Sequence, residues 1–325
     1  MTWLVTGGAG YIGSHVVGAM QAAGHEVVVL DDLSSGVEAR LAGVPLVVGS
    51  VLDQAGVERA LRDHSVRGVV HLAGKKQVEE SVRRPLHYYE QNVEGLRRLL
   101  DAITAAGVEH FVFSSSAAVY GAPDEEQVTE ELFCRPVNPY GETKLIGEWM
   151  VAAVARATGL RYANLRYFNV AGAAVPTLAD TGESNLVPMV FRRLSDRRPP
   201  LIFGDTYPTP DGTCVRDFVH VADIASAHVS AAQALTAGRV RDLTANIGTG
   251  QGVSVRDVVE TIRSVTGTAD ESWSEPVVVG ARAGDPPRVV ASAERIRAEL
   301  GWKAQHDVRD MVASAWEGWV AHSGR

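Results

Sequence analysis

Tyr140 and Lys144 are the two residues whose types and spacing best suit proton transfer, in the segment Tyr140-Gly-Glu-Thr-Lys144. The segment follows Asn138-Pro139, and proline is well tolerated in the first turn of a helix, so we predict that a helix begins here. Residues four apart lie on one face of a helix. A lysine cation lowers the pKa of a neighbouring phenol from about 10, which would let Tyr140 remove a proton from a hydroxyl group. The alternative is an ordinary pair on a helix surface.

Three consecutive serines, Ser114-Ser-Ser116, end the strand that is predicted before this helix. Open α/β sheets form their binding sites at the carboxyl ends of their strands, so a hydroxyl group here can meet the tyrosine. We choose Ser116 as the second hydrogen-bonding partner of a substrate oxygen. The alternative is that the serines only satisfy backbone groups at the strand end.

A phosphate-binding turn is predicted near the start of the chain, where an apolar strand runs into closely spaced glycines and a helix, from Trp3 to His15. This is the pattern of a dinucleotide-binding βαβ unit. Glycines allow positive φ and let the backbone approach a pyrophosphate at the helix N-terminus. The alternative is a tight turn of any α/β protein. The predicted cofactor contacts of this turn are Gly7, Gly10, Tyr11, Ile12 and Gly13.

Asp31 follows a second apolar strand, Glu26 to Leu30, about twenty residues beyond the glycines. An acid at this place binds the ribose hydroxyls of an adenosine and repels a 2′-phosphate. The sequence therefore predicts NAD as the cofactor rather than NADP.

Three further polar residues are candidate cofactor contacts: Asp53, Lys76 and Asn92. The chain has only four lysines among its 31 basic residues, and two of them are Lys75 and Lys76. We expect Lys76 to face the cofactor, whereas a solvated loop position is an even alternative for Lys75. Asp53 is expected near the adenine, and Asn92 is either a cofactor contact or an ordinary polar helix position.

Composition narrows the function classes. The 325 residues are 46% hydrophobic, with a net charge of −8 and no basic cluster, which argues against nucleic acid or an anionic membrane as partner. No apolar run approaches the roughly 18 residues of a membrane span, and the sequence enters its first strand at once, so we expect a cytoplasmic protein. Cys134 and Cys214 lack metal-ligand spacing, and we expect free thiols and no metal site.

Strands and helices alternate along the first half of the chain, which predicts a doubly wound parallel sheet, the Rossmann arrangement, with a smaller C-terminal substrate-binding lobe. Residues 1–169 are expected to form the dinucleotide-binding domain, with 219–248 returning to it; residues 170–218 and 249–325 are expected to form the second lobe. The predicted strands are Val44 to Val48, Gly68 to Leu72, His110 to Ser115 and Arg161 to Phe168; the predicted helices are Gln54 to Asp63, Pro85 to Ala106, Pro139 to Ala157 and Leu186 to Arg197.

Two of these helices, Pro85 to Ala106 and Pro139 to Ala157, carry apolar residues on more than one face. Burial on two sides within one chain and a dimer interface explain this equally well.

Several motifs together resemble the UDP-glucose 4-epimerases, extended members of the short-chain dehydrogenase/reductase group. Besides the glycine turn, the serines and the Tyr140 to Lys144 segment, the chain has Leu165-Arg-Tyr-Phe-Asn169, Asn185-Leu-Val-Pro188 and Phe203-Gly-Asp-Thr-Tyr-Pro-Thr-Pro-Asp-Gly-Thr-Cys-Val-Arg-Asp-Phe-Val-His220. The resemblance runs nearly from end to end.

This resemblance implies a role for each matching residue. Tyr140 looks like the base of the family, Ser116 its hydrogen-bonding partner, and Lys144 and Lys76 its cofactor-binding lysines. It also implies a homodimer through the two helices named above. The positions that match the UDP-binding and ribose-binding residues of the family are Asn169, Asn185, Arg216, Arg282 and Asp285.

The expected reaction is reversible inversion at C4 of a UDP-hexose through a 4-keto intermediate, with NAD retained as a catalyst. The alternative is another NAD-dependent nucleotide-sugar enzyme, a 4,6-dehydratase or a decarboxylase. Dehydratases of this group resemble Thr-Asp-Glu where this chain has Ser116-Ala117-Ala118, and alanine cannot move protons. A binding module that has lost catalysis need not keep Tyr140, Lys144 and Ser116.

The pattern departs from the family in two places: the loop from Ala174 to Ser184 is short, and Val289 stands where many members have tyrosine, beside the C2 substituent of the sugar. Because valine is much smaller, we expect UDP-N-acetylglucosamine and UDP-N-acetylgalactosamine to be accepted with UDP-glucose and UDP-galactose. The alternative is that Val289 only packs, with Arg288 or the short loop from Ala174 to Ser184 filling the space.

Overall fold

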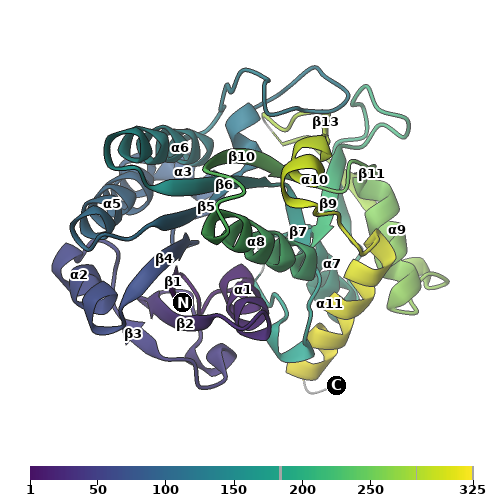
Figure 1. The fold of residues 1–325 in the computed structure, drawn as a ribbon. Helices are drawn as coiled ribbons and strands as arrows, with labels where there is room; N and C mark the ends of the chain where they lie inside the picture. Colours follow the sequence, from purple (N-terminus) through teal and green to yellow (C-terminus); the bar gives the residue numbers. More distant parts are fainter. Residues whose placement is uncertain (183–184, 283, 324–325) are drawn as a thin grey trace.

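A parallel seven-stranded sheet forms the centre of the molecule in the computed structural model, which describes residues 1–182, 185–282 and 284–323 (Figure 1). Its strand order is β10-β6-β5-β4-β1-β2-β3, and every neighbouring pair is parallel. The strands are β1 Thr2–Thr6, β2 Glu26–Asp31, β3 Leu46–Val48, β4 Val66–His71, β5 His110–Ser116, β6 Arg161–Tyr167 and β10 Asp242–Ile247.

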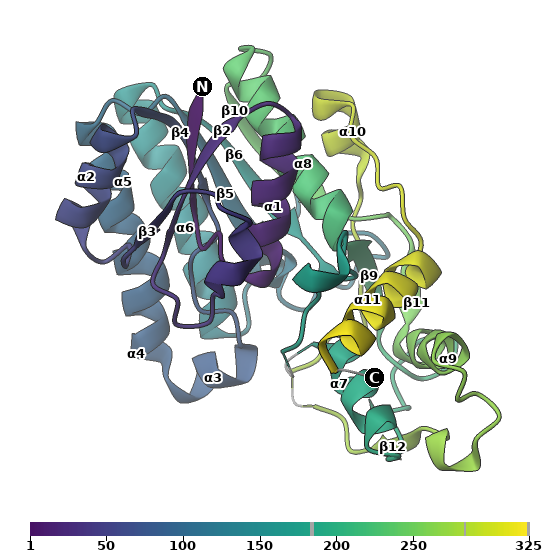
Figure 2. The same ribbon diagram turned by 90° about the horizontal axis from the view of Figure 1, so that it is seen from below.

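Helices cover both faces of this sheet (Figures 1 and 2). Helices α1 (Tyr11–Ala22) and α8 (Val221–Thr236) pack together on one face, and α2 (Gln54–Asp63), α5 (Gly95–Ala105) and α6 (Pro139–Thr158) form the opposite layer. Each face has its own cluster of buried apolar side chains. The predicted doubly wound parallel sheet is confirmed. Its chain order reverses between β1 and β4, where such folds bind their ligands.

Helix α6, which carries Tyr140 and Lys144, has well-defined ends. The Asn138 side chain accepts a hydrogen bond from the backbone N–H of Gly141 at 2.9 Å, and Pro139 occupies the first turn. Gly159 ends the helix in the left-handed conformation. These caps fix the first turn of α6, and with it the position of Tyr140.

The predicted helix from Pro85 to Ala106 is not continuous. Short helices α3 (Val78–Arg83) and α4 (Pro85–Tyr88) lead into a π-helical turn over Tyr89–Glu94, which precedes α5. A π-turn inserts an extra residue without a clear sequence signal and often lies at a functional site. Here it carries Asn92.

A smaller lobe follows β6 along the chain (Figure 2). Its core joins side chains of α7, α9 and α11 around Phe191 and Ile262. The division into domains at the boundaries given above stays a prediction. The remaining elements are β7 Asn169–Ala171, α7 Leu186–Ser195, β8 Leu201–Phe203, β9 Val215–His220, β11 Gly252–Ser254, α9 Val255–Val265, β12 Val277–Val279, β13 Arg288–Val289, α10 Glu294–Leu300 and α11 Val308–Ser323.

Candidate active site

The three serines at the end of β5 each have a different partner. The Ser114 carbonyl accepts a hydrogen bond from Lys144 Nζ at 2.9 Å. Ser115 Oγ donates to Glu148 Oε1 at 2.5 Å. The Ser116 hydroxyl accepts from the N–H of Ala118 at 3.1 Å, and its interaction with the Tyr140 phenol lowers the pKa of that phenol. The cluster therefore joins the strand end to helix α6, which is more than backbone satisfaction at a strand end requires.

The Tyr140 phenol and the Lys144 ammonium lie together at this strand end and are both buried, at 8% and 6% exposed. Lys144 Nζ lies 6.0 Å from the centre of the Tyr140 ring. Burial raises the pKa of Tyr140, and the hydrogen bond with Ser116 opposes this only in part. Burial lowers the pKa of Lys144 to about 8, opposed by the charge of Glu148. A cation, a phenol and a hydroxyl group therefore lie close together in a largely buried site. Such a set of groups is suited to proton transfer.

The glycine turn between β1 and α1 has the close backbone packing that a pyrophosphate site needs. Gly7 has a φ of +72°, and its N–H donates to the Leu30 carbonyl at 2.9 Å. A Cβ on Gly13 would overlap the Gly7 carbonyl oxygen and lie 2.8 Å from Gly8 Cα. Gly10 is the residue before the first turn of α1. The first N–H groups of a helix have no acceptor within the helix, so the start of α1 is suited to binding an anion.

The side chain of Tyr11 does not serve this turn directly. Its hydroxyl donates to the Gly172 carbonyl at 2.7 Å, so it bridges α1 to the segment that enters the smaller lobe. His15 Nε2 accepts from the N–H of Ala174 at 3.1 Å in the same segment. Any cofactor contact of Tyr11 is therefore made by its backbone. Ile12 is half-buried and packs against the core beneath the sheet face.

Asp31 lies at the carboxyl end of β2 and is 7% exposed. Its carboxylate accepts hydrogen bonds from the N–H groups of Ala9, at 3.0 Å, and Leu33, at 2.9 Å. The first bond ties the acid to the glycine turn. Asp31 is thus adjacent to the turn that would hold the pyrophosphate, as a ribose-binding acid must be.

The other predicted cofactor residues lie in different settings. Asp53 is the N-cap of α2, and its Oδ1 accepts from the N–H of Gly56 at 3.0 Å, so helix capping accounts for this acid. Lys76 is exposed, whereas Lys75 Nζ lies 3.3 Å from Ser34 Oγ. Asn92 binds the backbone of Lys75 with both ends of its amide, at 2.8 and 3.0 Å. Asn92 therefore shapes the loop that presents the two lysines.

Of the five predicted UDP-binding residues, two lie close to each other and the other three lie at separate places. Arg216 on β9 and Asp285 have atoms 3.8 Å apart, and the Arg216 side chain is 13% exposed. The exposed guanidinium of Arg282 stacks on the Phe203 ring, 3.9 Å from its centre. Asn185 precedes α7 and donates to Asp180 at 2.6 Å. Asn169 is exposed at the start of β7.

Val289 on β13 pairs with Arg216 on β9. Its side chain is 8% exposed and belongs to the large core cluster. It therefore places a small apolar surface directly beside the strand that carries Arg216. Of the loop from Ala174 to Ser184, residues 183 and 184 lie outside the described part of the chain.

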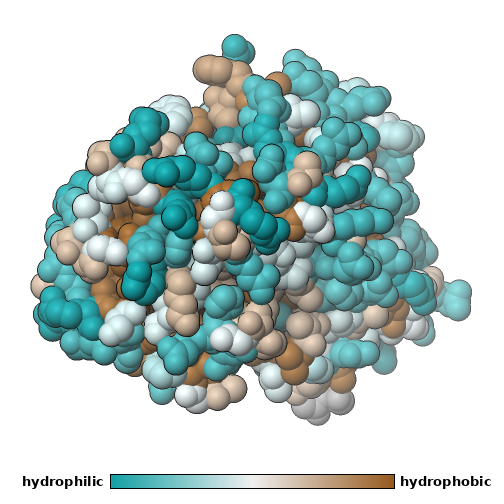
Figure 3. Space-filling model, in the orientation of Figure 1, coloured by the Kyte–Doolittle hydropathy of each residue, from teal (hydrophilic) through white to brown (hydrophobic). Residues whose placement is uncertain are grey.

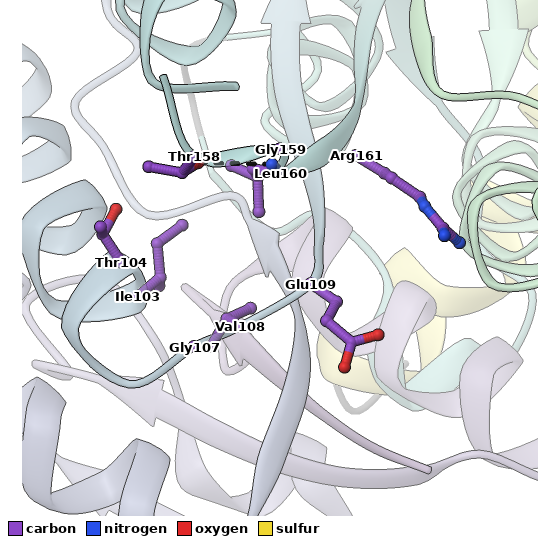
Figure 4. Close-up of a pocket in the computed structure, with 9 residues that line it drawn as sticks. All are labelled: Ile103, Thr104, Gly107, Val108, Glu109, Thr158, Gly159, Leu160 and Arg161. Carbon is purple, nitrogen blue, oxygen red and sulfur yellow. Dashed lines mark hydrogen bonds between the residues drawn. The ribbon is translucent and has the colours of Figure 1, made fainter. Parts of the chain in front are cut away.

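A separate pocket of about 230 Å³ lies at the opposite edge of the sheet (Figure 4). It opens beside the amino ends of β5 and β6, whereas Ser116 and Tyr167 end those strands on the other side. Glu109 and Arg161 are its only charged lining residues, so it offers no catalytic set. It is lined by Ile103, Thr104, Gly107, Val108, Glu109, Thr158, Gly159, Leu160 and Arg161.

Within the described ranges, no group of three or more His, Cys, Asp or Glu side chains is placed to hold a metal ion. The helices of those same ranges include none that is long and apolar enough to cross a membrane.

Sequence reasoning missed one buried charged pair at the site, Glu148 and Arg166. A signal was present, because Glu148 comes four residues after Lys144 and so extends the Tyr140 to Lys144 face by another turn. The partner Arg166 is in the Leu165 to Asn169 motif, where periodicity alone marks only a buried strand.

Comparisons with known proteins give a consistent result. The model of the NAD dependent epimerase/dehydratase family matches residues 3–248. The UDP-glucose 4-epimerase of Azospirillum brasilense is 47% identical over 324 residues, which cover 97% of this chain and 91% of that protein.

Two solved structures extend the likeness to the whole fold. One is a UDP-glucose-4-epimerase from Stenotrophomonas maltophila with bound NAD and formylated UDP-arabinopyranose; it has a TM-score of 0.93 and 40% identity, covering 100% of this chain and 99% of that one. The other is the UDP-Glc/GlcNAc 4-epimerase from Campylobacter jejuni, with a TM-score of 0.85 and 33% identity, covering 98% of each chain.

Proposed function

The chain belongs to the NAD-dependent epimerase/dehydratase family, and from this premise we propose how it acts. It catalyses the reversible C4 epimerisation of UDP-glucose and UDP-galactose through a 4-keto intermediate, with NAD as its cofactor. The single observation that carries the assignment is the set formed by the buried Tyr140 and Lys144 and the half-buried Ser116 at the end of β5, found in a chain that resembles UDP-glucose 4-epimerases over almost its full length. A 4,6-dehydratase or decarboxylase is not favoured, because Ala117 and Ala118 follow Ser116 where further acid and base groups would be needed.

The residues of the chain fit NAD. A Cβ at Gly13 would overlap the backbone of the turn, so glycine is strongly favoured there, and the Asp31 carboxylate lies beside that turn. Lys144 would hold the ribose on the nicotinamide side, and Asn92 would act by shaping the loop that carries Lys76. When bound, NAD supplies the two-electron acceptor for oxidation of C4 and the donor for its reduction.

Tyr140 acts as the base that removes the O4 proton as the sugar is oxidised, and returns it to the 4-keto oxygen in the second half of the reaction. Ser116 holds the same oxygen by a hydrogen bond. Burial raises the Tyr140 pKa, and the Lys144 cation together with the positive charge of the bound cofactor would lower it and stabilise the phenolate.

UDP is held by the smaller lobe. Arg216 and Arg282 are suited to binding the diphosphate, because a guanidinium forms paired, charge-assisted bonds to phosphate oxygens. Asp285 and Asn169 would bind the remaining polar groups of the nucleotide, and Asn185 stands at the start of α7 for the same purpose. A firm hold on UDP and a loose hold on the hexose let the 4-keto sugar turn and present its other face.

We extend the substrate range to the N-acetylated UDP-hexosamines. Val289 supports this extension by its size, since it lies on β13 beside Arg216 of β9 at a position where the family often has the larger tyrosine. The likeness to the Campylobacter jejuni protein, whose name includes both the glucose and the N-acetylglucosamine forms, supports this extension.

A homodimer through the segment from Pro85 to Ala106 and helix α6, with α3 packed beside them, completes the proposal. Helices α3 and α4 both contact α6, and together these helices expose Leu86 (81%), Trp149 (62%) and Val82 (61%). The face of the molecule shown in Figure 3 is mostly hydrophilic, with apolar residues scattered over it in small groups. Apolar side chains this exposed favour a protein partner, and we assign a second copy of the chain. Trp149→Glu should yield monomers in sedimentation, whereas Phe133→Glu, on an exposed loop residue, should not.

A cytoplasmic location belongs to the same proposal. Cys134 and Cys214 are both free thiols, as expected for a protein kept in a reducing compartment.

Replacement of Tyr140 tests the proposal directly. Tyr140→Phe should keep the fold and the bound NAD but reduce turnover about 10²-fold or more, the loss expected for a missing general base. Tyr162→Phe, near the amino end of β6, is the matched control and should leave turnover unchanged. Full turnover in Tyr140→Phe would remove this residue from its proposed role.

A further inference from the structure

A buried ion pair lies one helical turn beyond the catalytic lysine. Glu148 on α6 and Arg166 on β6 form two parallel hydrogen bonds, Nε to Oε1 at 2.9 Å and Nη2 to Oε2 at 2.6 Å. Their side chains are only 6% and 7% exposed. Burying two charges is expensive, and an apolar pair of similar size is often as stable, so stability alone does not account for the pair.

The pair is the centre of a network that reaches the catalytic strand. Ser115 Oγ, next to Ser116, donates to Glu148 at 2.5 Å. On the other side, Arg166 Nη1 donates to the Tyr120 hydroxyl at 2.9 Å, which in turn donates to Asn246 Oδ1 at 2.7 Å. The network therefore joins α6, β5, β6 and β10 behind the site.

The network meets both catalytic groups. Glu148 follows Lys144 by four residues on the same face of α6, and Ser115 precedes Ser116 on β5. A shift of Glu148 or Ser115 would thus move the Tyr140 phenol relative to the Ser116 hydroxyl.

We propose that Glu148 is a positioning residue for the reaction: held by Arg166 and Ser115, it keeps α6 in register with the end of β5 and keeps a negative charge one turn from the Lys144 ammonium. This inference rests on the proposed roles of Tyr140 and Lys144. Glu148 touches neither substrate nor cofactor and acts only through these residues.

The electrostatics of the site agree with this role. Burial lowers the pKa of Lys144 to about 8, and the Glu148 carboxylate is the one charge that opposes the decrease. Arg166 stays charged, because its bonds to Glu148 outweigh the effect of burial and raise its pKa. Burial lowers the pKa values of the nearby histidines and raises those of the nearby tyrosines and the thiol. These groups are His71, His228, Tyr120, Cys134, Tyr140, Tyr162 and Tyr167. A second buried carboxylate, Glu130, lies at the far end of the network, where it accepts from the backbone N–H of Asn246 at 2.7 Å and acts on Tyr120.

Loss of the charge at Glu148 should therefore appear in the pH profile. Without the carboxylate, Lys144 loses its proton at lower pH, so Glu148→Gln should move the alkaline limb of kcat/KM down by about 0.5 to 1 pH unit. The KM for UDP-galactose should change less than about twofold, since UDP is bound by the other lobe. The matched control is Glu109→Gln, which removes an exposed carboxylate that pairs with Arg67 and directly precedes β5. This variant should keep the wild-type pH profile of kcat/KM.

Two further variants separate the charge from the packing. Glu148→Gln combined with Arg166→Met removes both charges; it should regain thermal stability relative to Glu148→Gln but keep the shifted alkaline limb. Ser115→Ala removes one hydrogen bond without a change of charge, and should lower kcat about threefold with the limb unmoved. If Glu148→Gln alone does not fold, the double variant and Ser115→Ala still test the proposed role of Glu148.

An alkaline limb that stays at the wild-type pH in the folded Glu148 variants, or wild-type kcat in Ser115→Ala, would overturn the inference. The failure of the proposed function is a different result, because it would appear as full turnover in Tyr140→Phe. Loss of turnover in Tyr140→Phe together with unmoved limbs in the Glu148 variants would refute the role of Glu148 alone.

Discussion

Two glycines of helix α1 give a sharp test of the phosphate-binding turn, because the same substitution should have opposite effects at the two sites. At Gly13, an added Cβ would overlap the Gly7 carbonyl oxygen and lie 2.8 Å from Gly8 Cα, and both contacts are backbone atoms of the turn itself. At Gly18, in the same helix and exposed, an added Cβ would meet nothing within 4 Å.

The expected magnitudes follow from this geometry. Gly13→Ala should destabilise the protein by about 1 to 3 kcal/mol, the usual cost of overpacking, because the turn can relieve the overlap only by moving its backbone. Gly18→Ala should stabilise it by about 0.5 to 1 kcal/mol, since alanine is the better helix former.

The assay is urea unfolding of the NAD-free protein, followed by titration with NAD. Gly13→Ala should lower the unfolding midpoint and weaken NAD binding at least tenfold, whereas Gly18→Ala should raise the midpoint and bind NAD normally. Normal NAD affinity in Gly13→Ala would refute the assignment of this turn to the pyrophosphate. Equal destabilisation by both substitutions would show that overlap of the Gly13 Cβ with the backbone of the turn is not the cause of the loss of stability.

Three other outcomes are expected. Asp31→Ala should weaken NAD binding and reduce the preference over NADP, and tighter binding of NADP than NAD by the unmodified protein would contradict the role of this acid. Val289→Tyr should suppress turnover of the N-acetylated UDP-hexoses and spare the plain ones; an unmodified enzyme that ignores UDP-N-acetylglucosamine would refute the open pocket. Burial lowers the pKa of His71 to about 3 and those of His220 and His228 to about 4, below the ordinary value of about 6.5. Because the unfolded chain takes up these protons first, the free energy of unfolding should be fully retained above about pH 6.5 and fall as the pH decreases toward 4; a flat acid profile in denaturant titrations would contradict this.

The sequence predicted the parallel sheet and the placement of Tyr140 and Lys144 on one helix because both have local signals. Apolar strands alternate with helices, and the spacing of Tyr140 and Lys144 fixes their common face. The close packing at Gly13 was also predictable, because closely spaced glycines between a strand and a helix indicate a turn with little room for side chains.

Other features depend on contacts between distant segments and had no local signal. The π-helical turn that presents Asn92 looks like an ordinary helix in sequence. Glu148 and Arg166 are 18 residues apart, and only the parallel pairing of β5 and β6 beneath α6 brings them together.

The most direct test of the account follows the hydrogen at C4. UDP-galactose carrying deuterium at C4 should be converted to UDP-glucose that retains the deuterium at C4, as observed by NMR in ordinary water, because the same hydrogen is taken up and returned within one closed site. Replacement of the deuterium by solvent hydrogen, release of CO₂, or accumulation of a 4-keto-6-deoxy sugar would contradict the proposed epimerisation.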